Sequence, residues 1–232
     1  MLNNKFNYIT IDRSTEEGKR LYCLPDGSKV PSVTTILDKT KPQEAKDSLL
    51  AWRKRVGEAK AKEITTEAAG RGTRMHKFLE DFIKTGTLTA PGSNPYSKES
   101  YRMAQHVIEH GLKNVTEGWG VEIPLYFPGL YAGTTDGCGI HLGDESILDY
   151  KQTNKPKKEE WIQDYFLQLV AYALAHNEIY GTNIKKGVVL MCVKPQTTED
   201  QPRYQEFVLT PDKFDYWTQK WWDRVEAYYS NK

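Results

Sequence analysis

Cysteine is scarce in this chain. The three cysteines, Cys23, Cys138 and Cys192, are scattered over 232 residues, and no CxxC pair occurs. This pattern argues against a disulfide framework, a structural zinc site and a four-cysteine iron–sulfur cluster. A reducing, cytosol-like compartment fits it best.

Long apolar runs are absent as well. No stretch approaches the ~20 apolar residues that a membrane-spanning helix needs. The N-terminal residues MLNNKFNYIT lack the apolar core of a signal peptide and do not form an obvious organelle transit peptide. We therefore expect a soluble intracellular protein without a membrane partner, located in the cytoplasm, or in the host cytoplasm if a phage encodes it.

An excess of charge of one sign is also lacking, because 32 Lys and Arg residues balance 31 Asp and Glu residues to a formal net charge of +1. No global basic field indicates a nucleic-acid partner, so local patches would have to hold one. One candidate is the helical stretch 39–62, which carries eight basic residues against three acidic ones. Such a run is either a solvated helix face or a basic surface that binds successive phosphates of a DNA backbone, with Trp52 available to stack on a base.

Length and periodicity predict one compact α/β domain over 1–232. We expect 1–117 to form an N-terminal hairpin and a helical region, and 118–232 to form a sheet-and-helix core. Alternating apolar residues predict strands, and apolar residues at i, i+3, i+4 predict helices. The expected strands are a hairpin within 5–24, then 118–127, a hairpin over 131–153, 185–194 and 204–209; the expected helices are a short one after Ser32, then 43–69, 71–84, 98–113, 159–176 and one that begins at Pro211.

The stretch 131–153, YAGTTDGCGIHLGDESILDYKQT, carries the main chemical signal. Two strands joined by a turn at Gly143 would place Asp136 on the first strand and Asp149 with Lys151 on the second. An Asp-x-Lys pair at strand spacing puts both side chains on one face of the sheet. Two carboxylates and an ammonium that converge on one point suit a hard divalent cation and a phosphate.

His76 lies in the predicted helix 71–84, beside its apolar stripe and in line with Glu80 on a helical wheel. A histidine in that position is either a structural side chain or a ligand of the same metal site, and helical spacing does not decide between the two. His106 and His110 are spaced at i, i+4, which suits a metal, but no third ligand stands near them. We interpret that pair as surface residues.

Four further polar residues have more than one interpretation. Ser32 either caps the short helix that follows it or lies near a DNA phosphate. Gln168 and Tyr172 fall on one side of the apolar helix 159–176, where buried polar groups need partners. They are either ordinary core residues or face substrate or the metal-site carboxylates. Glu122 alternates onto a face of the sheet and is a secondary candidate for the site.

Several motifs follow one another along the chain. They are Gly72-x-x-x-His76-x-x-x-Glu80, Gly133-Thr134-Thr135-Asp136-Gly137, Asp149-Tyr150-Lys151 and Gln168-x-x-x-Tyr172. Together they resemble the RecB-like branch of the PD-(D/E)xK nuclease superfamily, and within it the mitochondrial genome maintenance exonuclease family and its phage relatives. The segments similar to counterparts in that family also include Pro31-Ser32-Val33-Thr34, Trp52-Arg53-Lys54-Arg55, Thr153-x-Lys155-Pro156-Lys157 and the final helix.

The resemblance implies a restriction-endonuclease-like core, with a mixed central sheet flanked by helices and an N-terminal helical arch. The metal ligands that it implies, for Mg²⁺ or Mn²⁺, are His76, Asp136, Asp149 and the backbone carbonyl of Tyr150. The catalytic residues that it implies are Asp136, Asp149 and Lys151. The residues that would support the site or contact DNA are Glu80, Gln168, Tyr172, Ser32, Trp52, Arg53, Arg55 and Lys155.

The resemblance also implies that single-stranded DNA is threaded from a free end beneath an arch formed by 39–62 and 71–84. We therefore predict a metal-dependent DNA exonuclease that prefers single strands. Two alternatives stay open: a double-strand 5′-exonuclease that works with a phage or host replication or recombination protein, and a catalytically inactive DNA-binding accessory protein. The chain departs from the family pattern at Thr135, where proline is common, and at Gln152, where a small hydroxyl residue is common.

Overall fold

A five-stranded mixed sheet forms the centre of the molecule. The computed structural model describes residues 2–16 and 19–230. The central elements are β4 (Val115–Phe127), β5 (Tyr131–His141), β6 (Asp144–Thr153), η2 (Glu159–Trp161), α5 (Gln163–Tyr180), β7 (Lys186–Val193), β8 (Arg203–Leu209) and α6 (Pro211–Ser230). The strand order is β4-β5-β6-β7-β8, and every neighbouring pair is antiparallel except β6 and β7. A parallel pair needs a crossover, which α5 provides.

The N-terminal part adds a small sheet and a set of helices. Its elements are β1 (Asp12–Glu16), β2 (Lys19–Cys23), β3 (Lys29–Pro31), α1 (Val33–Lys39), α2 (Gln43–Val56), α3 (Glu58–Thr85), α4 (Pro95–His110) and η1 (Leu112–Asn114). The antiparallel sheet β1-β2-β3 packs through Tyr22, Leu24 and Val30 against Ala132 of β5. None of the described helices is both long and apolar enough to cross a membrane.

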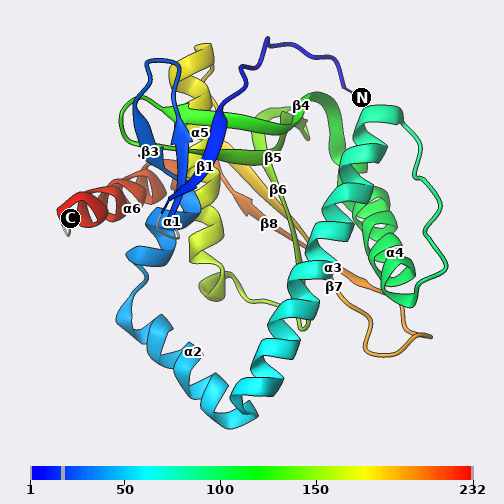
Figure 1. Cartoon of the computed structure of the whole chain (residues 1–232). Coiled ribbons are helices and arrows are strands. Elements are labelled where there is room, and N and C mark those ends of the chain that lie inside the picture. Colours follow the sequence, from blue (N-terminus) through cyan, green and yellow to red (C-terminus); the bar gives the residue numbers. More distant parts are fainter. Residues whose placement is uncertain (1, 17–18, 231–232) are drawn as a thin grey trace.

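Helices cover the central sheet on both faces (Figure 1). α1, α5 and α6 share one core with Ile147 of β6 and Met191 of β7. α3 and α4 share the other core with Leu148, Tyr150 and Leu190. Neighbouring residues of a strand face opposite sides, so the two cores divide β6 between them. The predicted mixed sheet flanked by helices is confirmed.

α2 and α3 form a bent arm that leaves the body of the protein and returns to it (Figure 1). Gly57 joins them with φ 85° and ψ 143°, a conformation that favours glycine, so α2 ends there. The predicted helix boundary at Gly70 is wrong, because α3 continues through that residue without a break. Its C-terminal half buries Met75, Leu79 and Ile83 against α4 and the sheet, and this packing stabilises the long helix.

The N-terminal hairpin lies later in the chain than predicted. Its strands are β1 and β2, whereas 5–11 is not a strand, and the centre of the expected turn lies outside the described residues. Phe6 and Tyr8 instead join an aromatic cluster with Trp119 and His176 on the α5 face. Burial of these rings takes the place of the strand pairing that alternation predicted. The other expected helices and strands are present, with ends shifted by a few residues.

Candidate active site

The sheet opens where the β5–β6 ladder ends. Pairing between the two strands stops at Gly137↔Leu148, so the adjoining residues Asp136 and Asp149 stand where the strands part. The backbone N–H of Tyr150 donates to Asp136 Oδ2 at 2.6 Å. A carboxylate thus takes the place of a strand carbonyl, and both aspartates are brought to one opening.

Asp149 and Lys151 are adjacent on one face of β6, as their spacing predicts. Lys151 Nζ lies 2.6 Å from Asp149 Oδ1. Asp149 is 4% exposed, and its other oxygen, Oδ2, is buried without a hydrogen-bond partner among the residues that the structure describes. Burial and the nearby charge of Asp136 raise the pKa of Asp149 to about 6, although Lys151 opposes the shift. A cation would satisfy such a buried oxygen.

α3 brings His76 to the opening from the other layer. Its Nδ1 lies 3.4 Å from Asp136 Oδ1, and its Nε2 lies 2.7 Å from the backbone carbonyl of Tyr150. A carbonyl only accepts, so Nε2 carries a proton and Nδ1 faces the carboxylate. Burial disfavours the charged imidazole, but the contact with Asp136 outweighs burial and raises the pKa of His76. Burial also opposes the charge of Asp136, yet the same contact lowers the pKa of that carboxyl.

Glu122 is a further acidic group at this opening, where the sequence marks it only as a secondary candidate. It stands on β4 across from Asp136. One carboxylate oxygen from each of these residues and a ring nitrogen of His76 lie within 4.8 Å of one another. Burial and the charge of Asp136 raise the pKa of Glu122. Its φ of 52° is uncommon outside glycine, and backbone strain of this kind is typical of functional sites.

These donors fit a divalent cation. Three carboxylates and one imidazole form the oxygen-rich set that suits Mg²⁺ or Mn²⁺, and the imidazole is more acceptable to Mn²⁺. Two observations support the fit: the cluster of His76, Glu122 and Asp136, and the Asp149 oxygen that lacks a partner within the described chain. The Tyr150 carbonyl, which the family resemblance makes a ligand, accepts a hydrogen bond from His76 in this structure.

A pocket of about 590 Å³ lies next to the site, between α2, α3 and the end of β6. Trp52, Arg55 and Lys155, which were expected to contact DNA, all line it. Tyr165 lines it too, and the Tyr165 ring centre lies 5.1 Å from Lys151 Nζ, which connects the pocket to the aspartates. The pocket therefore combines positive charge with aromatic rings. Its other lining residues are Ile64, Ala68, Arg71, Gln152, Thr153, Asn154 and Lys157.

Three predicted residues lie away from this pocket. Ser32 is the N-cap of α1, and its side chain accepts from the backbone N–H of Thr35 at 2.9 Å. Ser32 is 2% exposed, and the helix cap is one of the two roles that its place in the sequence indicates; a contact with a DNA phosphate stays a prediction. Arg53 is exposed on α2 and does not line the pocket. Glu80 forms an ion pair with Lys84 at 2.5 Å on the surface of α3.

Gln168 and Tyr172 lie on α5, beneath the sheet. Gln168 is half-buried and Tyr172 is buried. Tyr172 packs closely against β5: a Cβ added to Gly133 would lie 2.8 Å from the tyrosine ring. The absence of a side chain at Gly133 thus makes room for this ring, and a role for either α5 residue at the site stays a prediction.

Sequence reasoning missed Arg71 and Gln152. Arg71 is 1% exposed and donates from Nε to Gln152 Oε1 at 2.7 Å. Arginine is almost never fully buried unless it is paired, and its partner lies on another element. No local pattern in the sequence signals such a pair.

A mixed sheet whose two strands part at a pair of aspartates, with a lysine beside them, is the arrangement that the resemblance to PD-(D/E)xK nucleases implies. A family model described as the PD-(D/E)XK nuclease superfamily matches residues 140–231. The matched segment contains Asp149, Lys151, Gln168 and Tyr172. The resemblance to this superfamily that the motifs indicate is therefore confirmed.

Two related proteins align with most of the chain, beyond the segment that the family model matches. The chain is 28% identical over 211 residues to mitochondrial genome maintenance exonuclease 1 of Mus musculus. This alignment covers 87% of this chain and 59% of the relative. The chain is also 28% identical over 217 residues to the protein of the same name from Xenopus tropicalis, covering 88% of this chain and 58% of the relative. The chain thus spans less than two thirds of the length of these relatives.

One similar solved structure is a putative exonuclease from Eubacterium rectale, with a TM-score of 0.48 and 12% sequence identity. The superposition covers 69% of this chain and 64% of that chain.

Proposed function

We propose that this protein is a metal-dependent DNA exonuclease that hydrolyses single-stranded DNA from a free end. The observation that carries the proposal is the convergence of Asp136, Asp149 and His76 at the point where β5 and β6 part, with Lys151 bound to Asp149. The similarity to exonucleases over most of the chain supports the same conclusion.

The acidic cluster accounts for the hydrolytic chemistry. Asp136, Asp149, Glu122 and His76 would hold the ion. A bound Mg²⁺ or Mn²⁺ supplies Lewis-acid stabilisation and a more acidic water molecule. In hydrolysis the water oxygen forms a bond to phosphorus as the bond to the leaving oxygen breaks. The water gives up one proton and the leaving oxygen takes up one, and negative charge builds on the phosphoryl oxygens in the transition state. Lys151, fixed by Asp149 at 2.6 Å, places an ammonium where it stabilises that charge.

The adjacent pocket accounts for a preference for single strands. Arg55 and Lys155 provide charge for the phosphates, and Trp52 and Tyr165 provide rings on which unpaired bases stack. A base held in a duplex keeps its faces covered by its neighbours. Stacking against these rings therefore favours single-stranded substrate.

The bent arm supports a requirement for a free end. α2 and α3 leave the body and return to it (Figure 1). The pocket is lined by residues of α2, of α3 and of the end of β6. A strand that reaches the aspartates through this pocket passes beneath the arm. Threading of that kind admits a chain end and excludes a closed circle.

The test compares linear and circular single-stranded DNA of the same sequence, labelled at the 5′ or the 3′ end, with Mg²⁺ or Mn²⁺. We expect the linear strand to be degraded and the circle to survive. Cleavage of the circle at a comparable rate would overturn the free-end requirement. Faster loss of blunt duplex would favour the double-strand 5′-exonuclease, and metal binding without cleavage of any substrate would favour the accessory protein.

A further inference from the structure

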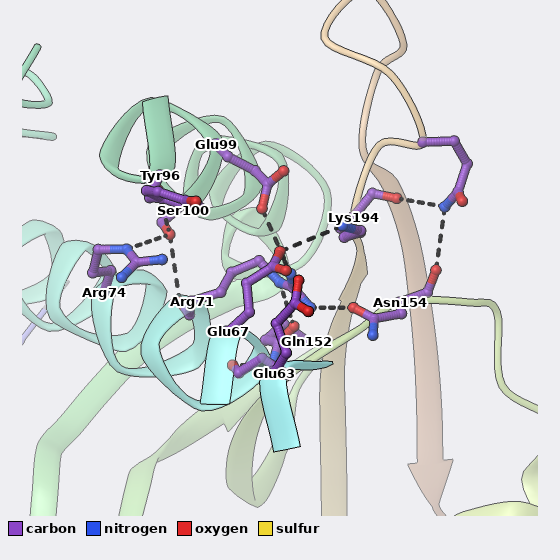
Figure 2. Close-up of polar contacts among 12 residues, drawn as sticks. Glu63, Glu67, Arg71, Arg74, Tyr96, Glu99, Ser100, Gln152, Asn154 and Lys194 are labelled. Carbon is purple, nitrogen blue, oxygen red and sulfur yellow. Dashed lines mark hydrogen bonds and ion pairs between the residues drawn. The ribbon is translucent and has the colours of Figure 1, made fainter. Parts of the chain in front are cut away.

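A buried polar network ties α3 to the end of β6 (Figure 2). Arg71 donates from Nε to Gln152 Oε1 at 2.7 Å, and another of its nitrogens donates to Asn154 Oδ1. Gln152 donates from Nε2 to the backbone carbonyl of Ala68 at 2.8 Å. Gln152 therefore holds both a side chain and the backbone of the same turn of α3.

The charges in this network are balanced. Arg71 lies 3.2 Å from Glu67 and 3.6 Å from Glu99, and Lys194 lies 3.5 Å from Glu67. Two cations thus face two carboxylates, which offsets the cost of burying the guanidinium. Ser100 of α4 adds a weak hydrogen bond to the Arg71 carbonyl at 3.5 Å, so that α4 supports the same turn (Figure 2).

The network lies beside the candidate metal ligands and contributes none of them, although Arg71, Gln152 and Asn154 also line the adjacent pocket. Gln152 directly follows Lys151 on β6, and Arg71 precedes His76 by little more than one turn of α3. Within the site itself, α3 and β6 are joined by the contact of His76 Nε2 with the Tyr150 carbonyl at 2.7 Å. That contact uses groups that the family resemblance assigns to a metal, whereas the Arg71–Gln152 contact uses none of them.

We propose that Arg71 and Gln152 are positioning residues, which hold His76 of α3 in register with Asp149 and Lys151 of β6. The expected effects of these two residues on metal affinity and on turnover rest on the proposed function. It also has a consequence that does not depend on that function: the contact restrains α3 against β6.

The experiment compares the full-length chain with Gln152→Leu, which keeps the approximate side-chain volume without hydrogen bonds, and Arg71→Lys, which keeps the charge without the planar fork. Gln219→Leu is the matched control, because Gln219 is exposed on α6 and its side chain donates to Asp223 on its own helix. Three quantities are measured: the Kd of Mn²⁺ without DNA, kcat and KM on linear single-stranded DNA, and amide hydrogen exchange.

We expect both network variants to bind Mn²⁺ about 10- to 100-fold more weakly. We also expect kcat to fall at least about tenfold while KM stays within about twofold. The rings and exposed cations of the pocket, Trp52, Tyr165, Arg55 and Lys155, are retained in both variants. Of the two altered residues that also line the pocket, Arg71 is 1% exposed and Gln152 carries neither charge nor ring. Exchange of the α3 amides from 68 to 80 should quicken, and exchange in α6 should not change. The control should match the unmodified chain in all three measurements.

A purely structural role gives a different result. If both variants unfold at a lower temperature but keep Mn²⁺ affinity and kcat within twofold at a temperature where they are folded, the positioning role is overturned. If the unmodified chain neither binds Mn²⁺ nor cuts DNA, the proposed function fails. In that case hydrogen exchange still tests whether the Arg71–Gln152 contact restrains α3 against β6. Faster exchange of the α3 amides in the variants supports the restraint, and unchanged exchange overturns it.

Discussion

α2 and β7 are opposite extremes of burial in this chain. Every residue of β7 is buried, between two neighbouring strands and under helices on both faces, whereas α2 has no buried residue. Asp149 stands on β6, next to β7, and Asp136 stands on β5, one strand further along the same sheet. Trp52 and Arg55 stand on the exposed arm. Catalytic geometry needs a rigid support, and an element with few buried contacts can move at low cost in free energy.

Because the sheet is buried and the arm is exposed, mutations in the two regions should affect different measured quantities. Changes in the core should reduce kcat or stability, because they act on groups that packing holds in place. Changes in the arm should act on substrate binding and on the choice between linear and circular DNA, and they should leave global stability nearly unchanged.

The largest expected effect follows Asp149→Asn in the core. The amide removes a ligand charge and the ion-pair partner of Lys151, so kcat should fall by at least about a thousandfold, which corresponds to about 4 kcal/mol of barrier. Turnover of linear single-stranded DNA measures the loss, and circular dichroism verifies the fold. Asp223→Asn, at an exposed site on α6, should retain full activity. Retained turnover in Asp149→Asn would contradict the assigned site.

The core should also lose stability in acid through His176. This residue is fully buried, with hydrogen bonds to Tyr8 Oη at 3.0 Å and to Thr182 Oγ1 at 2.8 Å. Burial and the charge of Lys5 lower the pKa of His176 from 6.5 to about 4. Between these two values the unfolded chain binds more protons, so stability present above pH 6.5 is lost as the pH falls towards 4.

Urea unfolding at pH 7 and pH 5 measures that loss, which we expect to be on the order of 2 kcal/mol from this residue. His176→Phe lowers stability at neutral pH but cannot titrate, so the pH-dependent part should shrink by that amount. An equal dependence on pH in both proteins would contradict a buried neutral imidazole.

A smaller effect, confined to substrate binding, is expected in the arm for Trp52→Ala. Loss of one stacking ring costs about 1–3 kcal/mol per base, so KM for single-stranded DNA should rise about 5- to 150-fold with little change in kcat. Thermal unfolding should hardly move, because α2 buries no residue. Leu50→Ala is the matched control on the same helix, because Leu50 is 52% exposed and does not line the pocket. A fall in kcat at constant KM would place Trp52 in the chemistry instead.

The smallest effect is expected for Gly57→Ala at the joint of the arm. A Cβ there meets no atom within 4 Å, so the cost comes from the positive φ of 85° and amounts to about 1 kcal/mol. Strain at the joint should alter the relative rates on linear and circular DNA while the melting temperature stays nearly constant. Gly27→Ala, at a similar φ of 82° in the N-terminal region, should not alter that ratio.

Much of the core could be predicted from the sequence. The Asp149-x-Lys151 spacing placed both groups on one strand face, and their contact at 2.6 Å agrees with that geometry. The apolar stripe of the helix that carries His76 also predicted which side of α3 is buried. These inferences succeeded because strand and helix periodicities are local properties of the backbone.

Contacts between distant elements could not be predicted in the same way. Arg71 and Gln152 each look like an ordinary surface residue in the sequence, and only the packing of α3 on β6 pairs them. Glu122 was one of several acidic candidates until its neighbours in space were known. The end of α2 at Gly57 was missed because many glycines are tolerated within helices, as Gly70 is in α3.

The sequence by itself determined which groups are available for chemistry and on which kind of element each one stands. Alternation and helical spacing follow from backbone geometry, so they can be read without knowing the fold. The tertiary structure decided which of these groups meet: where β5 and β6 part, which carboxylates share the opening with His76, and how Trp52 and Lys155 come to line one pocket. Those outcomes depend on the packing of whole layers, which no local pattern contains.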